Sequence, residues 1–356
     1  MITLSNPGGS KKDCVKRSML QRALLIVFSL VSQAFAEPMT FASPTNIFAP
    51  ASTPAHSIYG LSLLVLGITA CIFTIVVGLM TYIVVKFRRR PEDDDREPAQ
   101  VYGSIQVEVA WTVIPILIVV VLFMATARVI ASVQSPTLDN AVKVTAVGHQ
   151  FWWEYRYPGL NIVTANELHI PVSDPVHPTP TLITLLSADT DHSFWVPRLA
   201  GKTDLIPNRT NSMWIDPQQT GLFLGQCAQY CGTQHAKMLL RVYVQSREEF
   251  DRWVREQSQS AHLSDTVSEG RRIFENTACT KCHVVTGTPA TGQFGPDLSH
   301  LMSRETIGAG VAANTHENLR QWIKNPGAIK PGALMPAMGL NEHELDAVTA
   351  YLETLR

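Results

Sequence analysis

Two long uncharged stretches constrain this sequence more than any other feature. Residues 57–85 contain no Asp, Glu, Lys or Arg, and neither do residues 109–127. A helix of about 20 apolar residues can cross the hydrocarbon core of a membrane, because a helix satisfies its backbone polar groups internally. The sequence therefore predicts two membrane spans, about 57–86 and 109–130, within a transmembrane hairpin at 37–135.

The charges around these stretches predict their orientation. The connection begins with KFRRR, Lys86–Arg90, and loops rich in Lys and Arg stay in the cytoplasm. Everything after Arg128 is then expected outside the cytoplasm. Residues 1–36 resemble a signal peptide, with a basic start, a short apolar core and a small-residue AFA sequence for cleavage. A third membrane anchor is the alternative for this segment.

Composition narrows the classes of partner and cofactor. The net charge of −1 and the lack of a basic stripe argue against nucleic acid as a partner, whereas membrane lipid is expected around the hairpin. Cys14 and Cys71 have no other ligand types nearby, and the other four of the six cysteines form two close pairs. This arrangement indicates metal or cofactor binding rather than a disulfide framework.

The rest of the chain divides into two regions of different pattern. Residues 136–246 contain short strand-like runs separated by turns, which predicts an all-β sandwich or barrel. Residues 247–265 read as a short helix followed by a linker. Residues 266–356 are mostly helical, which predicts a separate small domain. In its last predicted helix, an apolar face is formed by Leu345, Val348, Leu352 and Leu355. Asn341 with Glu344 is the expected cap at the start of this helix.

The helical region contains CTKCH, residues 279–283. Cys-x-x-Cys-His is the attachment site of c-type haem. Cys279 and Cys282 are expected to add to the haem vinyl groups, and His283 is expected to bind the iron. A thioredoxin-like redox pair or a zinc knuckle is the alternative, but the adjacent histidine and the absence of a βαβ pattern favour haem.

A methionine is the expected sixth iron ligand, because methionine raises the potential into the range of electron carriers. Met335 and Met338 are the candidates in ALMPAMG. The FGPDL sequence, residues 294–298, adds to the likeness, and the region as a whole resembles a class I cytochrome c. That resemblance favours Met335, which precedes a proline ahead of the last helix, and leaves Met338 as the second choice.

A second cluster of metal-ligand types occurs in CAQYCGTQHAKM, residues 227–238. Cys227, Cys231, His235 and Met238 need one further nitrogen ligand, and His192 lies upstream in SADTDHSFWVP. Thiolate, imidazole and thioether ligands suit copper in electron transfer. Two cysteines can bridge two coppers, so the exchanged electron is shared between them. Zinc and a disulfide are the alternatives; zinc would not use the methionine.

The segments GHQFWWEYRYP, ADTDHSFWVPRLAGKTDLIPNRTN and GQCAQYCGTQHAKM, behind a two-helix hairpin, resemble cytochrome c oxidase subunit II. The resemblance covers about residues 57–244. It implies a cupredoxin-like sandwich that holds the dinuclear copper centre CuA. The implied ligands are His192, Cys227, the backbone carbonyl of Gln229, Cys231, His235 and Met238.

The resemblance also implies roles for three residues outside the metal clusters. Where relatives carry an electron-accepting tryptophan directly after His-Gln, this chain has Phe151, so Trp152 and Trp153 are the expected electron path. Packing within a strand is the alternative for these rings. Glu108, near the start of the second span, is expected at the entrance of a proton channel, with an ordinary interfacial carboxylate as the alternative.

Together these features predict a multidomain membrane protein: a two-helix transmembrane hairpin, an all-β cupredoxin-like sandwich and an all-α class I cytochrome c domain. The expected function is electron transfer from haem c to CuA and on to the haem–copper centre of subunit I. There O2 is reduced to water with proton translocation, so no catalytic residue is expected in this chain. Subunit I, subunit III, and a cytochrome c or a quinol:cytochrome reductase complex as donor are the expected partners.

The expected location is a bacterial inner membrane, with both cofactor domains on the periplasmic side. Two alternatives remain: a CuA-containing subunit of a nitric oxide reductase, and a membrane-anchored copper-handling protein. The covalent haem argues against the second alternative. Quinol oxidases share the architecture but lack the copper ligands that this chain contains.

Overall fold

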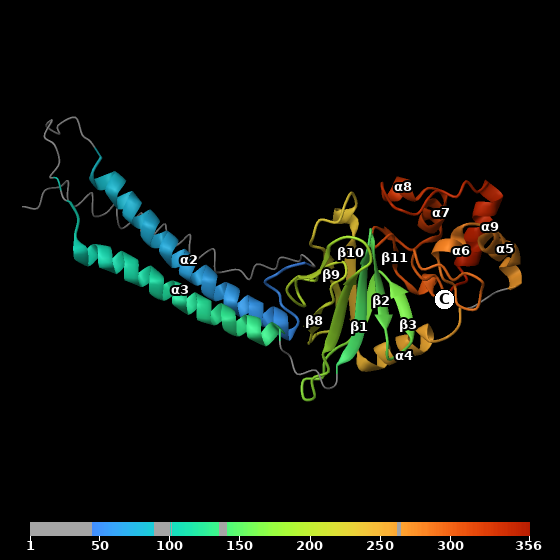
Figure 1. Cartoon of the computed structure of the whole chain (residues 1–356), viewed down its shortest axis with the longest axis horizontal. Helices are drawn as coiled ribbons and strands as arrows, with labels where there is room; N and C mark the ends of the chain where they lie inside the picture. The colour runs from blue at the N-terminus through green and yellow to red at the C-terminus, as the bar shows by residue number, and fades with distance from the viewer. Residues whose placement is uncertain (1–44, 89–99, 101, 135–140, 262–264) are drawn as a thin grey trace, which may run out of the picture. The chain divides into compact units, whose positions relative to one another are not determined.

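The computed structural model describes residues 45–88, 100, 102–134, 141–261 and 265–356 (Figure 1). These residues form two long helices, two five-stranded sheets and a C-terminal group of short helices. The predicted signal peptide, residues 1–36, lies outside the described residues, as do residues 89–99 of the basic connection. The predicted fold class is confirmed: a helical hairpin, a β-sandwich and a helical domain.

The hairpin consists of α2 (Thr53–Lys86) and α3 (Ile105–Gln134). The most apolar 18-residue window of each helix has 0% of its residues buried. A helix with apolar side chains on all sides is suited to an apolar environment such as lipid. Both helices are longer than the predicted spans. Their helical backbone continues into flanking residues that are not needed to cross the lipid. Pro54 in the first turn of α2 suits this extension, since its fixed φ is compatible with a helix start.

The hairpin is hydrogen-bonded to the sandwich at one end. The backbone N–H of Thr53, at the start of α2, donates to the carbonyl oxygen of Asp216 at 3.3 Å. Near the end of α3, the carbonyl oxygen of Val133 accepts from Nε1 of Trp214 at 2.6 Å. Trp214 belongs to β8 (Asn211–Ile215). The two helices are therefore tied to the same edge of the sandwich.

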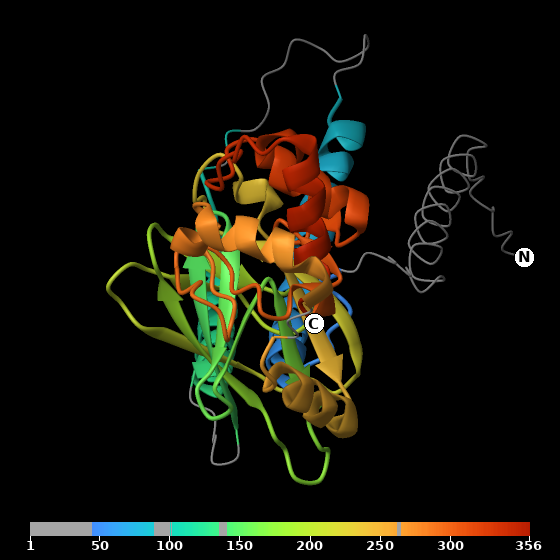
Figure 2. The ribbon, with the colours of Figure 1, turned by 90° about the vertical axis from the view of Figure 1, so that its right-hand side faces the viewer.

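The sandwich consists of two sheets with the strand orders β3-β2-β1-β5-β8 and β4-β10-β9-β6-β7. Figures 1 and 2 show its strands as arrows from two directions. β1 pairs in parallel with β5, and β4 with β10, whereas the other neighbours are antiparallel. The other strands, in chain order, are β1 (Val142–His149), β2 (Trp152–Tyr157), β3 (Ile162–Ala165), β4 (Glu167–Pro171), β5 (Thr181–Ser187), β6 (His192–Trp195), β7 (Thr203–Leu205), β9 (Gly221–Cys227) and β10 (Leu239–Gln245).

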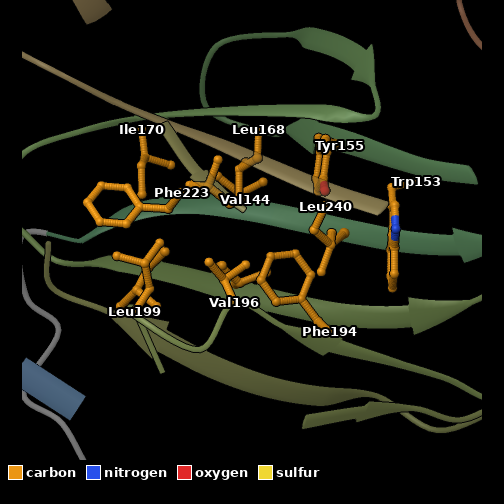
Figure 3. Close-up of a cluster of buried hydrophobic side chains, with 14 of the residues drawn as sticks. Val144, Trp153, Tyr155, Leu168, Ile170, Phe194, Val196, Leu199, Phe223 and Leu240 are labelled. Carbon is orange, nitrogen blue, oxygen red and sulfur yellow. The ribbon is translucent and has the colours of Figure 1, made fainter. Parts of the chain in front are cut away.

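Side chains from both sheets fill the space between them. Figure 3 shows Val144 and Trp153 from the first sheet with Phe194 and Phe223 from the second, all buried. In β10 the buried side chains alternate with partly exposed ones, as expected for a strand with one face against a core. The strands that carry the copper-ligand types are therefore held in a rigid framework.

Helix α4 (Arg247–Gln257) follows the last strand directly. A capping box between Ser246 and Glu249 fixes its start. Its Phe250 and Trp253 are buried in the same core as the sandwich. The predicted short helix is thus present, and it packs on the sandwich.

The C-terminal region has a hydrophobic core of its own. Its last helix, α9, confirms the predicted cap, since Asn341 and Glu344 form a capping box, and it buries Leu345, Val348 and Leu352 of the predicted apolar face. The helix ends at Leu352, so Leu355, which is also buried, lies beyond it rather than on its face. The elements of this region are η2 (Asp265–Val267), α5 (Ser268–Asn276), α6 (Cys279–Cys282), η3 (Leu301–Ser303), β11 (Thr306–Ile307), β12 (Ala312–Ala313), α7 (His316–Lys324), α8 (Pro326–Ile329) and α9 (Glu342–Leu352).

Close packing of α5 against α9 depends on Gly270. A Cβ atom at this position would lie 1.9 Å from the carbonyl oxygen of Ala347, which is backbone and cannot rotate away. We expect Gly270→Ala to destabilise the helix pair by about 3 kcal/mol, because the two helices must separate. Amide hydrogen exchange in α5 and α9 of the full chain should then accelerate about 100-fold. Gly159→Ala is the matched control, since nothing lies within 4 Å of that position; equal exchange in both variants would contradict the prediction.

Candidate copper and haem sites

The six predicted copper-ligand groups converge at one end of the second sheet. His192 is the first residue of β6, and Cys227 is the last residue of the neighbouring strand β9. The loop between β9 and β10 brings Cys231, His235 and Met238 back toward them. Antiparallel pairing fixes this arrangement, because Phe194 of β6 lies opposite Cys227. The cluster thus combines two strand ends with one loop.

The distances within the cluster suit a shared metal centre. The two cysteine sulfurs are 3.9 Å apart, much longer than the ~2 Å of a disulfide bond. Nδ1 of His192 lies 3.9 Å from Sγ of Cys227, and Nδ1 of His235 lies 3.7 Å from Sγ of Cys231. Sδ of Met238 is 3.9 Å from Sγ of Cys231, and the carbonyl oxygen of Gln229 is 3.2 Å from Sγ of Cys227. Each sulfur therefore has further ligand atoms beside it, as a pair of bridged metals requires.

Asp189 orients the buried ring of His192. Its Oδ1 lies 2.8 Å from Nε2 of His192, so Nδ1 of the ring faces the cysteines. A carboxylate on the far nitrogen of a metal-binding histidine fixes the tautomer and raises the basicity of the ligand. Burial lowers the pKa of His192, but the hydrogen bonds with Asp189 and Cys227 outweigh burial, and the net pKa is raised.

The cysteines are coupled in a way that favours one thiolate. The hydrogen bond with Cys231 lowers the pKa of Cys227, and hydrogen bonds with His192 and with the backbone of Gln229 and Ser193 act in the same direction against burial. Since thiolate rather than thiol binds metal, the cluster is prepared for a soft cation. Thiolates, imidazoles and a buried thioether together fit copper; zinc would leave Met238 without a role.

The predicted haem-attachment residues line an apolar cavity. Its empty volume is about 1300 Å³, which includes open solvent at its mouth. Cys279 and Cys282, at the two ends of α6, and His283 lie on one wall. Met335 and Met338 also line the cavity, and both are half-buried. The predicted attachment residues and both candidate methionines therefore border the same space.

The side chains around the cavity fit a c-type haem. Nδ1 of His283 lies 2.8 Å from the carbonyl oxygen of Pro296; this carbonyl can only accept, so Nδ1 donates and Nε2 is left to bind a metal. Burial lowers the pKa of His283, which favours the neutral imidazole. Arg304 also lines the cavity, and within the described part of the chain its buried Nε has no hydrogen-bond partner. A haem carboxylate would supply one.

The aromatic residues of the predicted electron path occupy different environments. Trp153 is fully buried and packs edge-on against His192, with ring centroids 6.0 Å apart. Trp152 stacks on His149 at 4.2 Å and lines the haem cavity. Phe151, between the cavity and the copper loop, was not anticipated as part of a path. Trp153 thus lies on the copper side and Trp152 on the haem side.

Glu108 lies in the first turn of α3 and is exposed. Its backbone carbonyl accepts a hydrogen bond from Oγ1 of Thr112 at 2.8 Å. The side chain of Glu108 is exposed and can therefore meet water or another subunit.

Several residues that support the two sites were missed by sequence analysis. Asp189 was detectable, since a metal-binding histidine usually has a carboxylate, carbonyl or water on its other ring nitrogen, and Asp189 lies only three residues before His192. Gln150, whose Nε2 donates to the carbonyl oxygen of Cys231 at 2.6 Å, and Lys330, whose Nζ donates to three backbone carbonyl oxygens, carry no sequence signal, because their partners are distant in the chain. Burial lowers the pKa of Lys330 to about 7.

Comparison with known proteins agrees with this architecture over most of the chain. Family models match in three places: the transmembrane domain of cytochrome c oxidase subunit II at residues 42–128, its periplasmic domain at 142–245, and cytochrome c at 267–356. Cytochrome c oxidase subunit 2 of Alkalihalophilus pseudofirmus is 35% identical over 86% of this chain and 90% of its own length. The chain belongs to the cytochrome c oxidase subunit II family.

Other relatives within the family extend the same agreement. Cytochrome c oxidase subunit 2 of Bacillus sp. PS3 is 35% identical over 76% of this chain and 80% of its own length. The subunit 2 of Bacillus subtilis is 29% identical over 86% and 90%, respectively. The predicted resemblance is therefore confirmed, and it includes the cytochrome c domain.

Membership of the family confirms the predicted cofactors and general function. This subunit II carries CuA copper and haem c, and Cys227 and Cys231 are positioned near His192 for copper binding. It is an electron-transfer subunit of a cytochrome c oxidase. With its two apolar helices it is a membrane protein with an extracytoplasmic domain.

Proposed function

We propose that CuA is held by the six groups that converge at the end of the second sheet: His192, Cys227, the carbonyl oxygen of Gln229, Cys231, His235 and Met238. The observation that carries this proposal is the placement of nitrogen, oxygen and thioether atoms within 3.9 Å of the two cysteine sulfurs. No other described group of His, Cys, Asp and Glu brings three ligand atoms together in this way. The main-chain carbonyl of Gln229 serves regardless of its neutral side chain.

In the same proposal, Cys279 and Cys282 would hold haem c covalently, and His283 and Met335 would bind its iron. Nδ1 of His283 donates to the carbonyl oxygen of Pro296, which would leave Nε2 available to bind the iron. Met335 is preferred because it precedes a proline ahead of the last helix, and Met338 stays the second choice. Arg304 provides a buried cationic partner for a haem carboxylate.

The two cofactors are one-electron carriers, so this chain acts as an electron relay. The donor is a cytochrome c or a quinol:cytochrome reductase complex, and the acceptor is the haem–copper centre of subunit I, where O2 is reduced and protons are translocated. Subunit III completes the assembly, and lipid surrounds α2 and α3. The location is a bacterial inner membrane, with the sandwich and the cytochrome c domain on the periplasmic side.

Trp152 and Trp153 contribute to the electron path in this proposal. Trp152 borders the haem cavity, and Trp153 packs against His192, so the two rings flank the gap between the sites. Glu108 is proposed to stand at the entrance of a proton channel in subunit I, which is supported by its exposed position in the first turn of α3. Nothing in the structure favours a nitric oxide reductase or a copper-handling protein over this relay.

Metal analysis of the full chain tests the proposal. The protein, expressed with haem maturation and copper and purified in detergent, should contain about two coppers per haem. Its EPR spectrum should show one unpaired electron shared between the two coppers. A single copper with the spectrum of an isolated ion, or zinc alone, would overturn the ligand assignment.

A further inference from the structure

Lys330 connects the cytochrome c domain to the copper loop. It follows α8, and only 2% of its surface is exposed. Its Nζ donates at 2.8 Å to each of three carbonyl oxygens, those of Phe151, Lys237 and Gly308. Phe151 lies between β1 and β2 of the sandwich, and Lys237 is the residue before Met238. One ammonium group therefore spans the sandwich, the copper loop and the cytochrome c domain.

This contact depends on the cytochrome c domain being docked on the sandwich. An ammonium group has three N–H donors, and all three are used. A buried cation is costly unless acceptors replace its lost water, and the lowered pKa of Lys330 reflects that cost. Since two of the three acceptors belong to the sandwich, separating the domains would leave those donors and acceptors to water.

In a second buried contact, the charged side chain belongs to the sandwich and its partners belong to the cytochrome c domain. Glu167, the first residue of β4, is 1% exposed. Its Oε1 accepts from the backbone N–H and from Oγ1 of Thr306 at 2.9 and 2.6 Å, and its Oε2 accepts from the N–H of Glu305 at 3.0 Å. Arg241 and Tyr243 of β10 add hydrogen bonds to Oε2 of Glu305 at 2.8 and 2.6 Å. Here an anion of the sandwich binds the cytochrome c domain.

The region beside these contacts joins the two cofactor sites. Gln150 and Phe151 of the sandwich line the haem cavity together with Cys279 and Cys282. On the other side, Nε2 of Gln150 donates to the carbonyl oxygen of Cys231. The Phe151 ring lies against Gly232, where a Cβ atom would be 3.0 Å from the ring. A single layer of protein thus separates the haem cavity from the copper loop.

We propose that Lys330 and Glu167 are reciprocal buried clamps that hold the cytochrome c domain on the copper loop, and that Lys330 is a positioning residue for internal electron transfer. In that transfer one electron leaves haem c, which is oxidised, and reduces CuA. Electron tunnelling weakens steeply with distance, so a fixed docked position sets the rate. This inference rests on the proposed relay.

Lys330→Met tests the clamp in the assembled oxidase, because methionine keeps much of the side-chain length and removes the donors. A photoexcited ruthenium complex reduces haem c, and the absorbance of CuA reports the internal transfer. We expect the rate to fall about tenfold or more, with unchanged haem c and CuA spectra and potentials. Amide hydrogen exchange at residues 305–308 should rise, because this segment loses its cover.

Two further variants keep the result interpretable. Glu167→Gln acts on the other clamp, away from the copper loop, and should also raise exchange at residues 305–308 and slow the transfer. Lys202→Met removes an exposed lysine of the sandwich, half of whose side chain is accessible, and should match the unmodified protein. If Lys330→Met does not assemble, Glu167→Gln alone decides the question.

The outcomes that overturn the inference are distinct. Unmodified rates and exchange in Lys330→Met and Glu167→Gln would show that the domains are held in another way. Loss of the CuA spectrum in Lys330→Met, with a normal Glu167→Gln, would show that the lysine shapes the copper loop rather than the docking. Failure of the relay itself would appear as the absence of CuA reduction in the unmodified protein, whereas the exchange measurement would still test the clamps.

Discussion

Replacing Cys231 with serine is expected to abolish the CuA signal and to lower oxidase turnover by about 100-fold or more. Its sulfur lies within 3.9 Å of ligand atoms of Cys227, His235 and Met238, so it is central to the cluster. A serine oxygen is a harder ligand and does not bridge copper as a thiolate does. Copper content, EPR and oxygen consumption of the assembled oxidase measure the effect.

Cys71→Ser is the matched control for this experiment. Cys71 lies on α2 and is exposed, away from the copper loop in sequence and in ligand environment. We expect the control to retain both coppers and full turnover. Haem c in the Cys231→Ser protein should still be reduced by an external donor, because its attachment cysteines are unchanged. A Cys231→Ser protein with two coppers and a normal mixed-valence spectrum would remove Cys231 from the ligand set.

Met335→Leu is expected to lower the reduction potential of haem c by on the order of 0.1 V, because the axial ligand is a main determinant of that potential. Leucine fills a similar volume without a sulfur, so the sixth position opens and the reduced haem should bind carbon monoxide. A lower potential makes haem c a stronger reductant for CuA, so reduction of haem c by the external donor, rather than transfer to CuA, is the step expected to slow. Redox titration and absorption spectra of the full chain measure both effects.

Met338→Leu serves as the paired variant, because both methionines line the same cavity. We expect it to keep the potential and to exclude carbon monoxide. The reverse pattern, with Met338→Leu open to carbon monoxide and Met335→Leu unchanged, would assign the ligand to Met338. The two variants together therefore identify the methionine that binds the haem iron, which the position of either side chain in the cavity does not decide.

The sequence was most informative where a local pattern has one physical meaning. The uncharged runs predicted α2 and α3, and the spacing of Leu345, Val348 and Leu352 predicted the buried face of α9. Strand-like runs such as residues 239–245 predicted β10, because its side chains alternate between core and surface. The metal clusters were also recognised from spacing, since their ligands recur within one or two loops.

Features that depend on distant contacts were not predictable in this way. The short strand β7 and the glycine-containing strand β9 lack the period-2 signal, and pairing with neighbours stabilises them. Lys330 and Glu167 look like ordinary surface charges in the sequence. Their burial follows from the meeting of two domains, which no local pattern encodes. Met335 stays the first choice and Met338 the second; both methionines line the cavity, so their positions in it do not separate them.

Helix α4 limits how far the cytochrome c domain can travel. Phe250 and Trp253 anchor it in the sandwich core, so only residues 258–264 connect that fixed end to η2. A fully extended chain of this length reaches about 28 Å at most. Any release from the copper loop is therefore followed by recapture within a small volume, at a rate independent of protein concentration. Each oxidase is consequently expected to reduce its own copper centre rather than that of a neighbouring complex.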